Sequence, residues 1–184
     1  MTTTRKDDLK ITRLTTPLSK SDVGHLRAGG LVILDGKIFT FRDKAYQRVI
    51  SGKKPPADLK GSVIYHCGPI VKKTQNGWKI ISAGPTTSAR MDPMQVDFVR
   101  RTGARALVGK GGIGKEVAGR LAGLGCIYFA YTGGAGALAA SQVQEVENVF
   151  WEELGPEAIW VLRVRDFGPL VVSTDTVGGN LYER

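Results

Sequence analysis

The sequence predicts an α/β domain with a mixed, partly parallel sheet and helices on one side. Between residues 106 and 146, short apolar segments alternate with helical ones, a rhythm typical of parallel strands joined by right-handed crossovers. The last third of the chain adds further strand-like segments outside this rhythm. With 184 residues, 42% of them hydrophobic, the chain is long enough to bury a core, so we expect one domain over residues 1–184.

The N-terminal part of the chain predicts strands before the first helix. Residues 1–13 are polar and charged, which indicates an extended or strand-like lead-in. Two apolar runs, residues 31–34 and 38–41, flank Asp35-Gly36. An Asp-Gly pair between two apolar runs is typical of a tight turn, so we expect these runs to form a hairpin.

Several of the remaining elements end at or near Gly or Pro, which interrupt helices and strands. Further strands are expected over residues 63–65, 78–83, 106–108, 126–130, 148–151, 159–164 and 170–173. Helices are expected over residues 42–50, 115–122 and 137–146, with another that begins at Asp92-Pro93 and ends before Gly103.

Composition excludes several classes of protein. No apolar run approaches ~18 residues, so we expect no membrane span, and residues 1–8 lack the apolar segment of a signal peptide. Cys67 and Cys126 are too few for a disulfide framework, which fits the cytoplasm. His25 and His66 lack ligand spacing with these cysteines, so no zinc site is expected.

The formal net charge of +9 indicates an acidic partner or an anionic substrate. Nucleic-acid binding is the alternative, because basic proteins also bind phosphate backbones. The basic residues are scattered, however, and aromatic residues do not alternate with them as stacking platforms do. We therefore expect no nucleic-acid partner.

Residues 84–92, Gly-Pro-Thr-Thr-Ser-Ala-Arg-Met-Asp, form the strongest local motif. They place hydroxyl groups and Arg90 on a turn between a strand and a helix, where exposed backbone N–H groups favour an anion. A guanidinium is a planar donor suited to a carboxylate. A structural role, in which Thr86, Thr87 and Ser88 only cap the turn, stays open.

A second glycine-rich motif occupies residues 109–115. Its glycines match G-x-G-x-x-G, but no acidic residue ends the following strand, and Glu116 stands where a P-loop has Ser or Thr. A nucleotide-binding module is therefore the alternative from a different class. We favour a loop that carries Lys110 to an anion.

Arg42, Arg90 and Lys110 follow or flank three separate strands. In a sheet with parallel strands, such turns gather along one edge, where ligands bind. Three cations without acidic catalysts predict a small substrate that has more than one carboxylate.

The motif at residues 84–92 closely resembles the signature of the C-terminal domain of class I fumarases and of the beta subunit of L-tartrate dehydratase. The resemblance covers nearly the whole chain and includes four further ordered segments. These segments are residues 14–18, 38–43, 107–112 and 167–175.

The resemblance implies a three-layer β/β/α swivelling domain and a partner. A separate alpha subunit is implied to hold a [4Fe-4S] cluster through three cysteines, a set that this chain cannot supply. We therefore expect a hetero-oligomer with the substrate between the cluster and this chain.

The resemblance also implies roles for single residues. Thr86 matches the residue proposed as catalytic base, Lys110 an active-site cation, and Arg42 and Arg90 substrate-carboxylate ligands; Thr87 is the neighbouring candidate. The family commonly reads Arg-Asp-x-Ala-His where this chain has Tyr46 in the His position. The implied activity is reversible hydration of fumarate to L-malate, with dehydration of tartrate to oxaloacetate as the alternative.

Overall fold

The computed structural model describes residues 11–75 and 77–182. Within them, seven strands form one sheet in the order β1-β2-β3-β6-β7-β9-β8, and β4 and β5 form a separate hairpin. The strands are β1 Ile11–Thr15, β2 Leu31–Thr40, β3 Val63–Tyr65, β4 Ile70–Thr74, β5 Gly77–Ser82, β6 Ala106–Gly109, β7 Ile127–Ala130, β8 Val143–Phe150 and β9 Ile159–Thr174. The helices are α1 Lys20–Gly24, α2 Asp43–Ile50, α3 Asp92–Thr102, α4 Lys115–Gly123 and α5 Gly136–Ser141, with 3-10 turns Ser88–Met91 and Glu152–Glu157.

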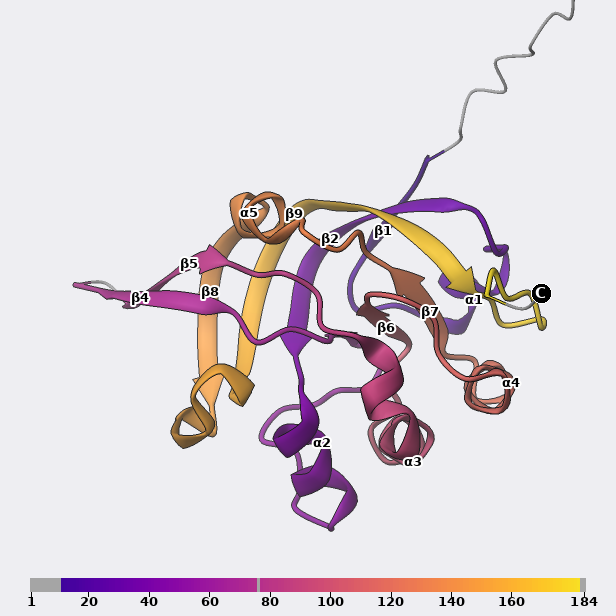
Figure 1. Cartoon of the computed structure of the whole chain (residues 1–184), viewed down its shortest axis with the longest axis horizontal. Coiled ribbons are helices and arrows are strands. Elements are labelled where there is room, and N and C mark those ends of the chain that lie inside the picture. Colours follow the sequence, from indigo (N-terminus) through magenta and orange to yellow (C-terminus); the bar gives the residue numbers. More distant parts are fainter. Residues whose placement is uncertain (1–10, 76, 183–184) are drawn as a thin grey trace, which may run out of the picture.

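The long strand β9 closes part of the sheet into a ring. It pairs antiparallel with both β2 and β7, while β2, β3, β6 and β7 pair in parallel. These five strands therefore form a small barrel (Figure 1). The predicted mixed α/β arrangement with parallel crossovers is confirmed, but the prediction did not include this closure.

Alternate residues of the parallel strands face two different cores. Tyr65, Val108 and Phe129 point into the barrel interior, which a ring of this size fills with side chains. Ile64 and Leu107 point outward, where α2, α3 and α4 cover them. These helices lie on the same side of the ring (Figure 1), as expected from the alternation of side chains along a strand.

The hairpin expected around Asp35-Gly36 is wrong, because residues 31–40 form the single strand β2. Gly36 has a φ of 103° and lies at a register shift between β2 and β9. The glycine therefore permits a bulge instead of a turn. The pairing with β9 along both halves of β2 keeps the strand continuous.

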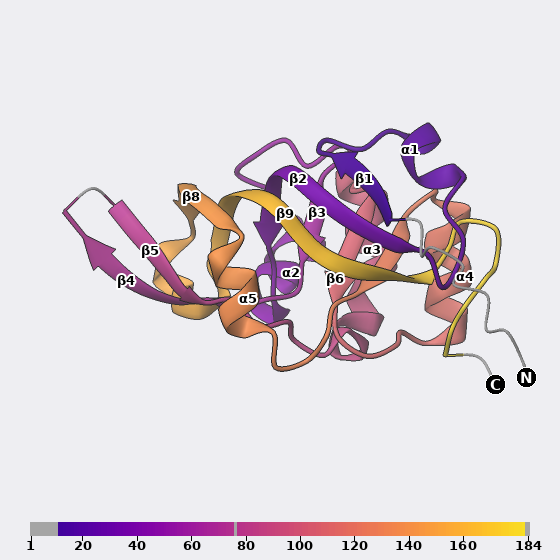
Figure 2. The ribbon, with the colours of Figure 1, turned by 90° about the horizontal axis from the view of Figure 1, so that it is seen from above.

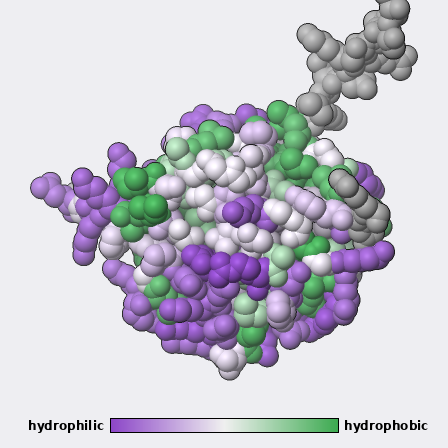
Figure 3. Space-filling model, viewed as in Figure 1, coloured by the Kyte–Doolittle hydropathy of each residue, from purple (hydrophilic) through white to green (hydrophobic). Residues whose placement is uncertain are grey.

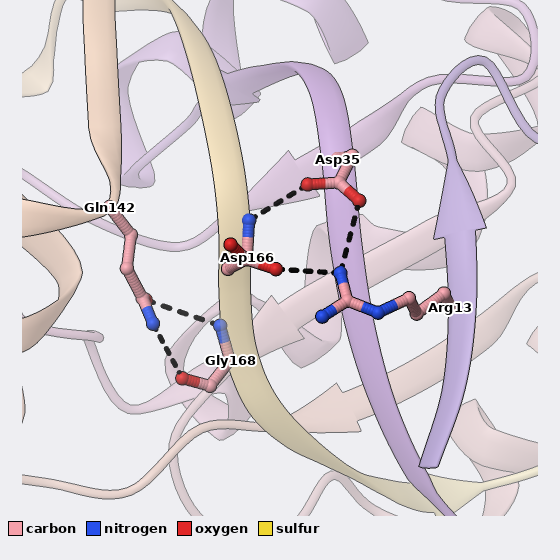
Figure 4. A network of polar contacts seen from close by, with 5 residues as sticks. All are labelled: Arg13, Asp35, Gln142, Asp166 and Gly168. Carbon is pink, nitrogen blue, oxygen red and sulfur yellow. Dashed lines mark hydrogen bonds and ion pairs between the residues drawn. The ribbon is translucent and has the colours of Figure 1, made fainter.

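The two strands expected at residues 159–164 and 170–173 are one strand, β9. Its irregular middle is held by polar contacts from β1, from β2 and from the residue before β8 (Figure 4). Arg13 lies 2.6 Å from Asp166, and Asp35 accepts from the Asp166 N–H at 2.8 Å. Gln142 donates to the Gly168 carbonyl at 2.8 Å and accepts from its N–H at 3.2 Å. These contacts satisfy the backbone where the ladder shifts.

The helix expected over residues 137–146 is wrong in its second half, because α5 ends at Ser141 and β8 begins at Val143. Val143 and Val146 pair with Val164 and Leu162 of β9. Tertiary pairing therefore decides the structure of a segment whose local pattern also suits a helix. The strand expected at 148–151 is the end of β8.

The other expected elements are confirmed within a few residues, including α2, α3, α4, β3, β5, β6 and β7. Of the lead-in at residues 1–13, residues 1–10 lie outside the described part, and the rest belong to β1. The β4–β5 hairpin projects away from the barrel (Figure 2). No helix of the described residues is long and apolar enough to span a membrane.

Candidate functional site

Four parallel strands of the barrel end at one edge. Thr40 pairs with Tyr65, Tyr65 with Val108, and Gly109 with Ala130. The segments that follow these strands, which contain Arg42, His66, Lys110 and Tyr131, therefore start side by side. Ligands bind at this kind of edge in many α/β proteins.

The Thr86–Ser88 segment is held at this edge by backbone hydrogen bonds. The Thr86 N–H donates to the His66 carbonyl at 2.6 Å, and the Lys110 N–H donates to the Thr86 carbonyl at 3.1 Å. The Ser88 N–H in turn donates to the Lys110 carbonyl at 3.1 Å, and Thr87 forms a parallel bridge with Lys110. Thr86 and Thr87 are thus fixed directly beside Lys110.

Arg42 and Arg90 share one carboxylate. Arg90 Nη2 lies 3.3 Å from both carboxylate oxygens of Asp43, and Arg42 Nη2 lies 3.8 Å from Asp43 Oδ2. Arg42 is also 4.0 Å from Glu157. The Arg42 Nε atom is buried, and no residue of the described ranges accepts a hydrogen bond from it. Because buried donors are nearly always paired, this atom is suited to a ligand.

A short segment, residues 67–68, connects Arg42 with the Thr86–Ser88 segment. The Arg42 guanidinium lies against Gly68, where an added Cβ would approach Nη1 to 3.0 Å. Cys67 forms an antiparallel bridge with Pro85, which precedes Thr86. Arg42, Thr86, Thr87, Arg90 and Lys110 therefore lie in one connected region, as the sequence predicts. Their individual roles stay predictions.

The surface of this region is open. The side chain of Arg90 is 53% exposed and that of Arg42 23%. Lys110 lines a cavity of about 430 Å³ with Tyr131, Thr132 and Tyr182, among other residues. Figure 3 shows strongly hydrophilic side chains in the middle of a paler face, where β2, α2 and the turn before α3 meet in Figure 1. The site can thus receive an anion from solvent.

Two polar side chains lie buried beneath the Thr86–Ser88 segment. The His66 ring forms two hydrogen bonds of 2.7 Å each. Its Nε2 atom is bonded to Tyr46 Oη and its Nδ1 atom to Ser88 Oγ. Burial lowers the pKa of His66 to about 3 and raises that of Tyr46 well above its ordinary value. Both groups are therefore neutral near pH 7.

Sequence reasoning missed His66 and Asp43 as members of this region. In the sequence, Asp43 belongs to the helix expected over residues 42–50, and His66 lacks the spacing of a zinc ligand. One signal was available for His66, since it directly follows the buried strand 63–65 at the predicted binding edge.

The glycine-rich loop offers little room for a nucleotide. The Asp92 carboxylate already accepts from the Gly114 N–H at 2.8 Å, at the N-terminus of α4, so this anion position is filled by the chain itself. The Tyr182 ring lies against Gly112, where an added Cβ would approach its Cγ to 2.6 Å. The Gly114 N–H is therefore already used within the chain, and Lys110 remains the group of this loop expected to meet an anion.

The described residues do not fit an iron–sulfur cluster. Cys67 and Cys126 are both buried, and burial raises the pKa of each thiol to about 12, which disfavours the thiolate that binds metal. Residues 11–75 and 77–182 contain no group of three or more His, Cys, Asp or Glu side chains arranged to hold a metal ion.

The fold and the site define a class: a barrel-based α/β protein that carries several cations at one open edge. The chain belongs to the family described as Fumarase C-terminus, whose model matches residues 1–184.

Three relatives illustrate the membership. L(+)-tartrate dehydratase subunit beta of Escherichia coli K12 is 44% identical over 170 residues, which cover 91% of this chain and 85% of the relative. A protein of Methanocaldococcus jannaschii named "Putative L(+)-tartrate dehydratase subunit beta" is 46% identical over 172 residues, 90% of this chain and 88% of the relative. "Putative fumarate hydratase class I" of Geobacillus stearothermophilus is 40% identical over 176 residues, 95% of this chain but 34% of that longer protein.

Proposed function

We propose that this chain is the beta-type subunit of a two-subunit hydro-lyase that interconverts fumarate and L-malate. Membership of the Fumarase C-terminus family supports the reaction class. Relatives named as beta subunits match over 85–88% of their own lengths, which supports a separate chain that works with a partner. A hetero-oligomer in the cytoplasm follows from this proposal.

The observation that carries the proposal is that the segments bearing Arg42, Thr86, Arg90 and Lys110 meet at one edge of the barrel. We assign Arg42 and Arg90 to the substrate carboxylates, with Thr87 beside them, because guanidinium groups bind carboxylates in a planar, two-point geometry. The orphaned Nε of Arg42 supports this assignment. A dicarboxylate would supply the acceptors that the protein itself does not.

The proposed chemistry of this chain is the handling of one proton. Removal of a proton from the carbon next to a carboxylate moves the electron pair toward that carboxylate, and the cations stabilise the resulting charge. One such preorganised donor is typically worth ~3 kcal/mol. We assign the proton transfer to the Thr86 hydroxyl, because the Thr86 backbone is hydrogen-bonded to that of Lys110 and a nearby cation favours the alkoxide.

The [4Fe-4S] cluster is proposed for the partner alpha subunit alone. The buried thiols of this chain do not suit a cluster, so this chain is proposed to supply none of the cluster's ligands. The three-layer swivelling arrangement implied by the resemblance likewise stays a prediction, which a structure of the two-subunit complex would test.

Tartrate is the second candidate substrate. The relatives named tartrate dehydratase subunit beta are 44–46% identical to this chain, against 40% for the fumarate hydratase relative. The proposed cations bind carboxylates that malate and tartrate share, so they do not discriminate between the two substrates.

The test is co-expression with a cluster-bearing subunit, anaerobic reconstitution, and measurement of kcat/KM for malate and tartrate. We expect higher kcat/KM for malate, and no turnover by this chain alone. A clear preference for tartrate would replace fumarate hydratase by the second candidate, and turnover by the isolated chain would contradict the two-subunit proposal.

Variants test the residue assignments. Arg90→Ala and Lys110→Ala are each expected to lower kcat/KM by about 10²-fold or more. Arg100→Ala is the matched control, because Arg100 is an exposed α3 residue that pairs with Asp97 on its own helix. Near-normal rates for either site variant would refute that assignment. ATP or NAD should leave the melting temperature unchanged, whereas a clear increase would favour the nucleotide-binding alternative.

A further inference from the structure

A chain of buried hydrogen bonds lies beneath the Thr86–Ser88 segment. It starts at Tyr46 on α2, passes through the His66 imidazole, and reaches Ser88 Oγ, with 2.7 Å at each step. All three residues are fully buried, with 0% of their surface exposed. Buried polar groups require partners, so each of these hydrogen bonds restricts where its partner can lie.

The chain continues to the Lys110 loop through Tyr128. The Tyr128 hydroxyl donates to the Gly111 carbonyl at 2.7 Å, so its single proton is used on that carbonyl. Burial raises the pKa of Tyr128, and the Ser88 side chain acts against this rise. The Ser88 side chain therefore lies next to the group that holds the Lys110 loop.

The Tyr46 hydroxyl determines the tautomer of His66. Among the described residues, His66 Nε2 is its one hydrogen-bond partner, so the buried hydroxyl proton has to go to Nε2. A neutral imidazole whose Nε2 accepts carries its proton on Nδ1, which then donates to Ser88 Oγ. Tyr46 therefore selects the tautomer that allows His66 to hold Ser88.

The chain connects the two loops that carry the proposed active-site groups. Ser88 follows Thr86 and Thr87, while Gly111 follows Lys110. Gly109 closely limits the space around the Ser88 hydroxyl, because an added Cβ at Gly109 would lie 1.9 Å from Ser88 Oγ. Gln95 Nε2 donates to the Ser88 carbonyl at 3.1 Å. Ser88 thus has one permitted position, and a displacement of Ser88 would separate Thr86 from Lys110.

We propose that His66 is a positioning residue: held as its Nδ1–H tautomer by Tyr46, it fixes Ser88 and thereby keeps Thr86 beside Lys110. The effect on reaction rate rests on the function proposed above. The tautomer and the ordering of the two loops do not depend on that function.

The first experiment needs no activity. In the full chain labelled with ¹⁵N-histidine, His66 should give the spectrum of a single neutral Nδ1–H tautomer at pH 7. The signals of His66 are identified as those that remain in the His25→Gln variant. Tyr46→Phe keeps the ring but removes the hydroxyl, so the spectrum should change to a mixture of tautomers. An Nε2–H tautomer or an imidazolium in the unaltered chain overturns the proposal, as does an unchanged spectrum in Tyr46→Phe.

Amide hydrogen exchange then measures the positioning itself. The amides of Thr86, Ser88 and Lys110 should exchange about tenfold faster in Tyr46→Phe, a ratio that the loss of one buried hydrogen bond would give. Tyr65→Phe is the matched control, because it removes a buried hydroxyl that donates to Ala83 outside the chain of bonds. Equal protection of these amides in the two variants overturns the proposal.

The reconstituted enzyme provides the third readout. Tyr46→Phe should lower kcat about tenfold with KM changed less than about twofold, because Thr86 is displaced while Arg42 is untouched. Tyr65→Phe should keep the wild-type kcat. A wild-type kcat in Tyr46→Phe overturns the catalytic part. If the unaltered complex hydrates no dicarboxylate, the proposed function fails, while the spectrum and the exchange rates still decide the positioning role.

Discussion

Gly109→Ala gives the sharpest test of how closely the site is packed. Gly109 is the last residue of β6, and an added Cβ would lie 1.9 Å from Ser88 Oγ and 3.1 Å from both His66 Nδ1 and the Thr86 carbonyl. No real contact is as short as the first of these distances. The Ser88 hydroxyl therefore has to leave its place and lose its hydrogen bond to His66.

The size of the effect follows from two destabilising contributions and one that opposes them. Overpacking of a buried site costs ~1–3 kcal/mol, and a lost hydrogen bond adds ~1 kcal/mol. The lower entropy of the unfolded chain with Ala returns ~0.4–1 kcal/mol. We expect the free energy of unfolding to fall by about 2–3 kcal/mol, which lowers Tm by roughly 5–10 °C for a chain of this size.

The assay is urea unfolding of the full chain, followed by tryptophan fluorescence, with the m-value used to check that the unfolding transition is unchanged. Gly119→Ala is the matched control. Gly119 lies within α4 with no atom within 4 Å of an added Cβ, so this change should stabilise the chain by ~0.5–1 kcal/mol.

A double-mutant cycle identifies the cause. Ser88→Ala removes the oxygen that collides with the new methyl group, so Gly109→Ala should cost about 1–2 kcal/mol less in that background. Two additive changes, or a stability of Gly109→Ala equal to that of the unaltered chain, would refute the packing described here.

Three further predictions use the charges of the described residues. Burial acts to raise the pKa of Asp175, but backbone N–H donors and Arg27 lower it below its usual value. Urea unfolding should therefore show that Asp175→Asn lowers the free energy of unfolding by ~1–3 kcal/mol at pH 7. This difference should shrink below pH ~4, because the carboxylate is protonated there. Burial lowers the pKa of His66 to about 3, below the ~6.5 of an unfolded chain. The free energy of unfolding of the wild type should therefore fall by up to ~1.4 kcal/mol per pH unit as the pH decreases between these two values. His66→Asn should reduce this dependence of the free energy of unfolding on pH. Asp43→Asn releases the guanidinium groups that Asp43 holds at 3.3 and 3.8 Å; steady-state kinetics of the reconstituted enzyme should show KM for the dicarboxylate about tenfold higher, while unfolding of the chain changes by less than ~1 kcal/mol.

Local signals predicted much of the fold. The apolar run at Val63–Tyr65 is β3 at the expected residues, and Gly103, with a φ of 69°, ends α3 in the left-handed conformation that glycine favours. The error at Asp35-Gly36 has a different origin. The same two residues suit a turn or a bulge, and the choice is made by β9, where Leu34 pairs with Phe167. No local pattern contains that information.

The candidate site likewise has parts that local sequence signals predict and parts that depend on tertiary contacts. That Arg42 and Lys110 lie at one edge was predictable, because each closely follows a strand end and parallel strands bring such ends together. Arg90 comes from a turn further along the chain and joins this edge through Asp43. His66 was not predictable as a positioning group, because its partners come from α2 and from the segment before α3. Its role depends on complete burial, which is a property of the folded chain.

The geometry of the site also gives a physical reason for a partner subunit. Preorganised cations stabilise developing charge strongly only where water is excluded, because the interaction energy falls with the local dielectric constant. Here Arg90 is about half exposed and Lys110 lines an open cavity, so water reaches both groups in the isolated chain. By contrast, His66 and Ser88, which hold the Thr86 segment beside Lys110, are fully buried within the chain itself. The chain therefore supplies a rigid arrangement of cations, and a second surface has to cover them before their charge can act at full strength.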